Sequence, residues 1–145
     1  MINAAGLTNV DFCEKNRRKA MYSHVTILKK TISSLNKNIF FVHISTDHLF
    51  NGKKMFYSEE SEPSPINNYA KTKLKSEKLV KTFKNYLIIR GNFFGWGSSY
   101  RKSFSDWILY SLKNKKNINL FSDIYFSPLY LETFINVIFE LILKN

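Results

Sequence analysis

Tyr69 and Lys73 lie four residues apart, and Ser45 and Thr46 follow a short apolar run, residues 39–44. On a helix, side chains four apart share one face. The Lys73 ammonium can therefore lower the pKa of the phenol, which is near ~10 in a free tyrosine. Hydroxyl groups at the carboxyl end of a parallel strand lie where open sheets bind ligands. Such a phenol could protonate a carbonyl oxygen while a nicotinamide supplies the hydride. Together these groups look like the proton-donating half of a nicotinamide-dependent carbonyl reductase. The alternative is a chance pair, because a tyrosine and a lysine four residues apart occur in many helices.

The segments that must position these groups alternate between apolar runs and helically periodic stretches. We expect buried strands at residues 1–6 (running into a loop), 39–44 and 86–90, and a short strand at 117–121. We expect helices at 11–36, capped by Asp11, and at 69–83, 102–113 and 131–144, with a loop at 91–100 and an interruption at Ser127-Pro128. Strand, helix, strand, helix, strand in this order is typical of parallel βαβ units, so the fold class is α/β.

Composition sets the class of protein. The chain has 145 residues and 44 % are hydrophobic, which suits one domain with a core and argues against disorder. The single cysteine, Cys13, excludes an intramolecular disulfide and is typical of a reducing cytosol. No run approaches the ~18 apolar residues of a membrane span, and no signal peptide opens the chain. We therefore expect a cytoplasmic protein without a membrane partner.

The charge balance is strongly basic. Lysine and arginine number 22 against 11 acidic residues, which gives a formal charge of +11. The lysines are spread along the whole chain, without an arginine-rich tract or a basic patch interleaved with aromatic residues, so we do not expect nucleic-acid binding. A positive surface would also attract an anionic nucleotide-sugar.

The last expected helix is unusually apolar. Its polar residues form one narrow stripe, made of Glu132, Asn136, Glu140 and Lys144, and apolar residues cover nearly everything else. A helix of this kind requires burial on most sides. Two explanations are open, namely partner segments outside these residues or self-association of the chain through this helix.

The histidines do not predict a metal site. His24, His43 and His48 fall in three different settings without the spacing of metal ligands. We expect His43 to be a hydrogen-bonded histidine of the core or of a strand face, and His48 to be a bystander near the site. We therefore expect no bound metal.

Longer motifs stand in order along the chain. They are Asn-Ala-Ala-Gly at 3–6, Thr-x-Val-Asp-x-x-Glu at 8–14, Ser-Thr-Asp-His-Leu-Phe-Asn-Gly at 45–52, the run from Tyr57 through Tyr69 and Lys73 to Glu77, Leu-Ile-Ile-Arg at 87–90 and Ser-Pro-Leu-Tyr at 127–130. Together they resemble the extended short-chain dehydrogenase/reductase superfamily, above all its dTDP-4-dehydrorhamnose reductase branch. The resemblance implies a partial Rossmann-like parallel sheet flanked by helices, in a single incomplete NAD(P)-binding domain over residues 1–145.

The resemblance also implies roles by position. Thr46 would polarise the substrate carbonyl, Tyr69 would donate the proton, and Lys73 would hold the ribose. Phe93 would lie close to the sugar. The implied activity is reduction of the 4-keto group of a dTDP-4-keto-6-deoxy sugar, in nucleotide-sugar and polysaccharide biosynthesis. The implied cofactor is NADPH or NADH, and the residues expected to line it are Ala4, Ala5, Ser45, Tyr69, Lys73, Gly91 and Asn92.

Some features depart from this branch. Ser23, His48 and Ala70 stand where it usually has Asn, Tyr and Gly. Residues 1–145 do not contain the Gly-x-x-Gly-x-x-Gly turn that holds the cofactor phosphates in the family. We therefore expect a fragment that by itself binds a dinucleotide weakly and is inactive. Two alternatives stay open. One is a non-catalytic regulatory or binding protein on the same scaffold, as the similar beta subunit of methionine adenosyltransferase implies; the other is an epimerase or dehydratase of the extended family.

Overall fold

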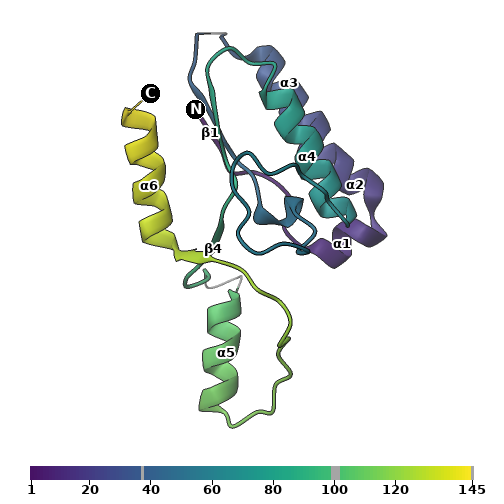
Figure 1. Cartoon of the computed structure of the whole chain (residues 1–145), viewed down its shortest axis with the longest axis vertical. Helices are drawn as coiled ribbons and strands as arrows, with labels where there is room; N and C mark the ends of the chain where they lie inside the picture. Colours follow the sequence, from purple (N-terminus) through teal and green to yellow (C-terminus); the bar gives the residue numbers. More distant parts are fainter. Residues whose placement is uncertain (37, 99–101, 145) are drawn as a thin grey trace. The chain divides into compact units, whose positions relative to one another are not determined.

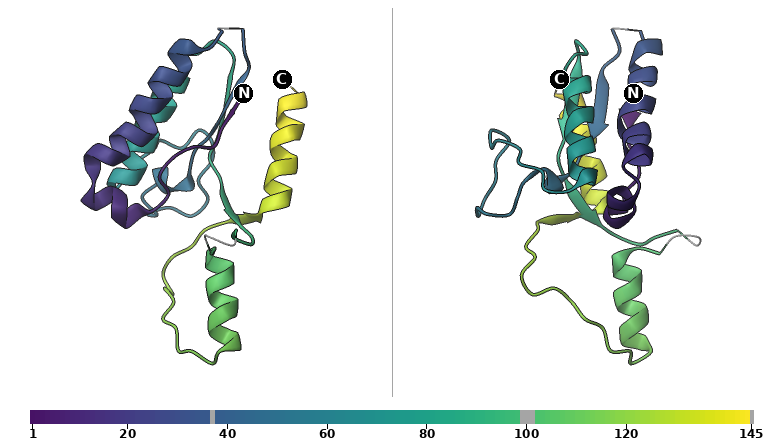
Figure 2. Two further views of the ribbon diagram at one scale, coloured as in Figure 1. Left: turned by 180° about the vertical axis from the view of Figure 1, so that it is seen from behind. Right: turned by 90° about the vertical axis from the view of Figure 1, so that its right-hand side faces the viewer.

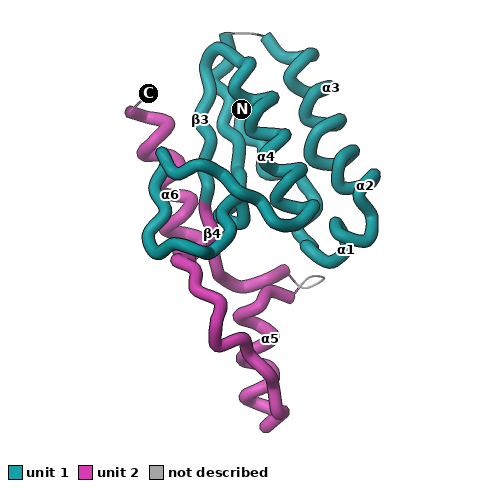
Figure 3. The backbone as a smooth tube through the Cα atoms, turned by 45° about the vertical axis from the view of Figure 1, so that its right-hand side comes forward, with its two compact units in different colours: residues 1–90 teal, residues 91–145 magenta. Residues whose placement is uncertain are grey.

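The computed structural model describes residues 1–36, 38–98 and 102–144. The chain forms two compact units, residues 1–90 (unit 1) and residues 91–145 (unit 2), which Figure 3 draws in teal and magenta. Both units contain parallel strands and helices, which confirms the α/β fold class. No helix in the described ranges combines the length and the apolar character needed to cross a membrane.

Three parallel strands form the sheet of unit 1. They are β1 (Ile2–Asn3), β2 (Phe41–Ile44) and β3 (Tyr86–Ile89), with β2 in the centre. Because the strands are parallel and in register, their carboxyl ends meet at one edge. β2 is buried, as expected for a central strand. The outer strands are less buried than expected, since Ile2 and Tyr86 are exposed.

The first helical region of unit 1 consists of α1 (Val10–Lys15), α2 (Arg17–Met21), the π-helix η1 (Tyr22–Thr26) and α3 (Ile27–Ser34). The prediction of one helix capped by Asp11 is therefore wrong in two respects. The cap is Asn9, whose Oδ1 accepts a hydrogen bond from the Phe12 N–H at 2.8 Å. The helix is interrupted at Asn16, whose side-chain amide donates to the Phe12 carbonyl at 3.1 Å. Asparagine competes with helical backbone bonds in this way.

The second helix of unit 1, α4 (Asn68–Val80), lies beside the first helical region on one face of the sheet (Figures 1 and 2). Buried residues of α3, β2 and α4, joined by Phe83, form the main core: Leu28, Phe41, Val80 and Phe83. Each such side chain contributes about 1.5–3 kcal/mol by leaving water. A second cluster joins α1, α2 and the start of α4 through Cys13, Ala20 and Tyr69. These contacts therefore pack the helix that carries Tyr69 and Lys73 against the sheet.

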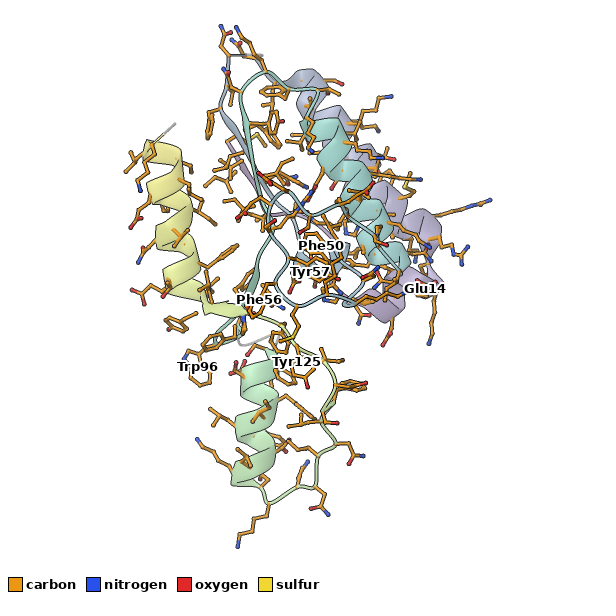
Figure 4. The ribbon with its side chains drawn as sticks, viewed as in Figure 1. Glu14, Phe50, Phe56, Tyr57, Trp96 and Tyr125 are labelled. Carbon is orange, nitrogen blue, oxygen red and sulfur yellow. The ribbon has the colours of Figure 1, made fainter. Side chains whose placement is uncertain are left out.

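A loop and the short 3-10 helix η2 (Asp47–Leu49) connect β2 to α4. Within this loop the rings of Phe50 and Tyr57 stack with centroids 4.4 Å apart, and Figure 4 shows the two side chains against each other. The Tyr57 hydroxyl donates to Asn51 Oδ1 at 2.9 Å and accepts from the Lys54 N–H at 3.1 Å. These contacts fold the loop back on itself before it enters α4.

Unit 2 contains a parallel pair of strands that the sequence reasoning missed. β4 (Asn92–Phe94) lies in the stretch expected to be a loop, and β5 (Pro128–Tyr130) begins where an interruption was expected. Proline is tolerated as the first residue of a strand. Residues 117–121 are described and form no strand, so that prediction is wrong. Residues 99 and 100 of the expected loop lie outside the described residues.

The helices of unit 2 are α5 (Phe104–Lys113) and α6 (Leu131–Leu143). Among the described residues of α6, Phe134 and Ile138 are buried, whereas Phe139 and Leu143 are exposed. The Phe134 ring packs on Phe93 of β4, with centroids 5.1 Å apart. Part of the apolar surface of α6 is therefore covered by strand β4, and part remains exposed.

Candidate active site

The carboxyl end of β2 carries the two predicted hydroxyl groups. Thr46 is buried and caps η2, because its Oγ1 accepts from the His48 N–H at 3.2 Å. Ser45 continues the pairing with β3 through its N–H, which donates to the Ile89 carbonyl at 2.7 Å. The Ser45 Oγ is buried and has no hydrogen-bond partner among the described residues. A buried hydroxyl without a partner costs about 1–3 kcal/mol, so this atom marks a position suited to a ligand.

Two side chains hold the start of α4. Asn67 Oδ1 accepts from the Ala70 N–H at 2.8 Å, and Glu14 Oε2 accepts from the Asn68 N–H at 2.9 Å. Both bonds satisfy amide groups that the first turn of a helix leaves unpaired. Because Tyr69 lies in this turn, the caps fix the backbone from which its side chain extends.

The Tyr69 ring is buried between two imidazoles. His24 and His48 meet it edge to face, with ring centroids 5.6 Å and 5.7 Å away. Its hydroxyl interacts with the Thr46 side chain at the end of β2. The structure therefore brings together the tyrosine and the threonine that the sequence predicted as partners.

Burial raises the pKa of Tyr69, and this effect outweighs the lowering caused by the Thr46 side chain. The charge of Asp47 raises the pKa further. The expectation that Lys73 lowers the Tyr69 pKa is therefore wrong for this structure. The phenol stays protonated at neutral pH, which is the form that a proton donor needs.

Lys73 is buried against the sheet instead of extending into solvent. Its Nζ donates to the Ile44 carbonyl at 2.6 Å. Burial lowers the pKa of Lys73 to about 8, and the nearby carboxylate of Glu77 partly opposes this shift. Tyr69 and Lys73 share the sheet-facing side of α4 as predicted, and one N–H of the ammonium is already directed to the strand end. An ammonium has three donors, and the described residues supply one acceptor, the Ile44 carbonyl, so two donors remain for another ligand.

A buried ion pair behind Lys73 was missed by the sequence reasoning. Glu77 is 1 % exposed, and Arg90 donates to its carboxylate with Nη2–Oε2 at 2.8 Å and Nε–Oε1 at 3.1 Å. Two bonds from one guanidinium fix both the distance and the plane of the carboxylate. The signal was present, because an acidic residue four positions after Lys73 shares its helix face. The partner, Arg90, follows β3 and could be assigned only from the fold.

Two buried histidines surround the site as hydrogen-bonded neutral groups. His24 lies 2.7 Å from Thr72 Oγ1 through Nδ1 and 2.8 Å from the Leu7 carbonyl through Nε2. His43 lies between Asn3 and Ser76, which confirms the expectation of a hydrogen-bonded strand histidine. Burial lowers the pKa of both, and that of His43 falls to about 3. Both therefore act as directional hydrogen-bonding groups at neutral pH.

These histidines predict acid sensitivity. The folded state binds fewer protons than the unfolded state between pH 6.5 and about 3, because the His43 pKa is lowered across that window. The free energy of unfolding should therefore fall as the pH drops, by up to ~1.4 kcal/mol per pH unit from this residue. Urea unfolding across this range should show a shallower pH dependence in His43→Gln than in wild type. His48→Gln is the control because His48 is exposed, and an equal change in both variants would contradict the assignment.

The remaining predicted residues fall into two groups. Ala4 and Ala5 are exposed and directly follow β1, at the same sheet edge as Ser45. Gly91, Asn92 and Phe93 belong to unit 2. A side chain at Gly91 would come within 2.4 Å of the Phe134 ring. The packing of Phe134 is therefore sufficient to explain a glycine at this position.

The parallel sheet with helices and the polar residues at its strand ends define an α/β protein of the Rossmann type. Residues 1–145 match the family described as "RmlD substrate binding domain", and the chain belongs to this family. The spore coat polysaccharide biosynthesis protein SpsK of Bacillus subtilis (strain 168) is 32 % identical over 145 residues, covering 97 % of this chain and 50 % of that protein.

Two further relatives are informative. The crystal structure of dTDP-4-dehydrorhamnose reductase from Bacillus anthracis str. Ames, in complex with NADP, superposes with a TM-score of 0.88 at 28 % identity, over 97 % of this chain and 50 % of that chain. Methionine adenosyltransferase 2 subunit beta of Rattus norvegicus is 51 % identical over 41 residues, which are 28 % of this chain and 12 % of that protein. This chain spans about half the length of SpsK and of the reductase.

Proposed function

We propose that this chain supplies the proton-donating part of an NADPH- or NADH-dependent reductase. The substrate would be the 4-keto group of a dTDP-4-keto-6-deoxy sugar, and the product would enter nucleotide-sugar and polysaccharide biosynthesis. The observation that carries the proposal is the Tyr69 hydroxyl beside Thr46 at the end of β2, with Lys73 on the same helix face. The similarity to the reductase in complex with NADP supports it.

The residues present fit a nicotinamide cofactor at this edge of the sheet. The buried Ser45 Oγ lacks a partner among the described residues, and the Lys73 ammonium has donors beyond the one directed to Ile44. Ser45 and Lys73 would hold the nicotinamide and ribose portion, and the cofactor would supply the hydride when bound. Thr46 would donate a hydrogen bond to the carbonyl oxygen. Tyr69 would transfer its proton to that oxygen as negative charge develops there.

The test of this proposal compares two lysines of α4. Replacing Lys73 with methionine removes a buried cation and its free donors, whereas Lys71→Met removes an exposed cation two residues away. A hydrogen bond from a charged group is worth about 1.5–3 kcal/mol. We therefore expect the Lys73→Met variant to bind NADPH about 10–100-fold more weakly than the wild-type protein does. The measurement is a fluorescence titration with NADPH, followed by its oxidation in the presence of the keto-sugar nucleotide.

Lys71→Met should bind NADPH like the wild type. Equal losses in the two variants would show that the effect comes from overall charge and would contradict the assigned role of Lys73. The assay uses the wild-type protein as its gene encodes it, because residues 1–145 alone are expected to bind a dinucleotide weakly and to be inactive. If that protein neither binds NADPH nor oxidises it, the result would count against the reductase proposal itself.

A second candidate function is a non-catalytic binding or regulatory subunit. The observation that favours it is the 51 % identity to methionine adenosyltransferase 2 subunit beta over 41 residues. If the chain has that function, Tyr69 and Lys73 would bind a ligand and would not take part in catalysis. The two candidates differ in one result, because only the reductase consumes NADPH when the keto-sugar nucleotide is added.

A further inference from the structure

A chain of hydrogen bonds connects β1, β2 and α4 through His43. The Ala5 N–H donates to Asn3 Oδ1 at 3.2 Å, so the amide nitrogen of Asn3 is the atom 3.1 Å from His43 Nδ1. His43 Nδ1 therefore accepts, and its Nε2 carries the proton that is donated to Ser76 Oγ at 3.0 Å. The Ser76 hydroxyl in turn donates to the Lys73 carbonyl at 2.6 Å. Each group has one consistent role from β1 to the backbone of Lys73.

The link between His43 and Ser76 is closed to water, whereas the Asn3 end is partly exposed. His43 is 2 % exposed and Ser76 is fully buried, between the sheet and α4. Burial lowers the pKa of His43, with smaller contributions from Lys73 and His24, so the imidazole keeps one donor and one acceptor. Breaking the link would leave a buried N–H without a partner, which costs about 1–3 kcal/mol.

Three side-chain contacts, called rungs below, join α4 to β2 and to the two residues that follow it. Ser76 meets His43, the Lys73 ammonium meets the Ile44 carbonyl, and Tyr69 meets Thr46. Their order along α4 is the reverse of their order along the strand, because the helix of a βαβ unit runs back over the sheet.

The spacings of the rungs agree. Seven helical residues from Tyr69 to Ser76 rise ~10.5 Å, and three extended residues from His43 to Thr46 span about 10 Å. All three rungs can therefore form at once without strain in either element. A slip of the helix along the strand would break all of them together.

We propose that His43 and Ser76 are positioning residues, which hold α4 in the register that places the Tyr69 hydroxyl at Thr46. The inference rests on the proposed function, because this register matters only if Tyr69 donates a proton to a substrate held at Thr46. Asn3 orients the His43 ring from β1. None of the three touches the reacting atoms in this arrangement, and each acts through Tyr69 or Lys73.

The test compares two serine-to-alanine variants of the folded chain by NMR. Ser76→Ala removes the rung, and Ser33→Ala removes a serine that makes a similar hydrogen bond to its own helix, to the Lys29 carbonyl at 2.8 Å, but is exposed. In Ser76→Ala we expect the nuclear Overhauser effect between the Tyr69 ring and the Thr46 methyl group to weaken, and the phenol pKa of Tyr69 to shift. In Ser33→Ala both should equal the wild-type values.

A purely structural role for Ser76 would lower the melting temperature and leave both Tyr69 readouts unchanged, and that result would overturn the proposal. If Ser76→Ala does not fold, Ser76→Cys keeps nearly the same volume with a much weaker hydrogen-bonding group and decides the question in the same way. These readouts need neither cofactor nor substrate. A failure of the reductase proposal would therefore be seen separately, in the NADPH assay.

Discussion

Replacing Tyr69 with phenylalanine should lower kcat for keto-sugar reduction by about 10²–10⁴-fold, the usual contribution of a positioned general acid. The variant keeps the buried ring, and with it the contacts to His24 and His48. It loses only the hydroxyl that interacts with Thr46. NADPH affinity should fall less than in Lys73→Met, because Lys73 and Ser45 are untouched and only one hydroxyl of the residues expected to line the cofactor is lost. The measurement is kcat at saturating NADPH and keto-sugar nucleotide.

Tyr57→Phe is the matched control. Its hydroxyl is also hydrogen-bonded, to Asn51 and to the Lys54 N–H, but it lies in the loop before α4 and is not part of the site. We expect its kcat to equal that of the wild type. A Tyr69→Phe protein with wild-type kcat would exclude Tyr69 as the proton donor.

Replacing Glu77 with alanine should lower the free energy of unfolding by about 3–5 kcal/mol, the range found when one partner of a buried ion pair is removed. Glu77 is 1 % exposed, and Arg90 is directed to both of its oxygens. The loss would leave a partly buried guanidinium unpaired beside the end of β3. Urea unfolding measured at constant pH gives the difference.

Arg17→Ala provides the comparison for an exposed pair. Arg17 lies 3.8 Å from Glu14 and its side chain is 76 % exposed, so its removal should cost about 0–1 kcal/mol. Similar losses for Glu77→Ala and Arg17→Ala would refute the claim that burial makes the Glu77 pair important. Glu77→Gln tests a second consequence, because loss of the carboxylate should lower the Lys73 pKa further below about 8.

The apolar runs and their order predicted the parallel βαβ arrangement of unit 1, because strand and helix periodicities are local properties of the chain. The long first helix was misjudged at Asn9 and Asn16, where side-chain bonds to the backbone compete with helical ones. Strands β4 and β5 were missed since each has three residues and becomes recognisable only when paired with the other. Short paired segments of this kind depend on contacts that are distant in sequence.

The sequence by itself determined that Tyr69 and Lys73 share one helix face and that Ser45 and Thr46 end a strand, because both statements depend on spacing alone. The tertiary structure decided everything that depends on burial and on distant partners. It raised the pKa of Tyr69 where a neighbouring lysine had suggested the opposite, and it paired Glu77 with Arg90. It also placed His43 against Ser76. The physical reason is that the pKa of a group and the partner of a buried polar atom are set by the surroundings that folding brings to it.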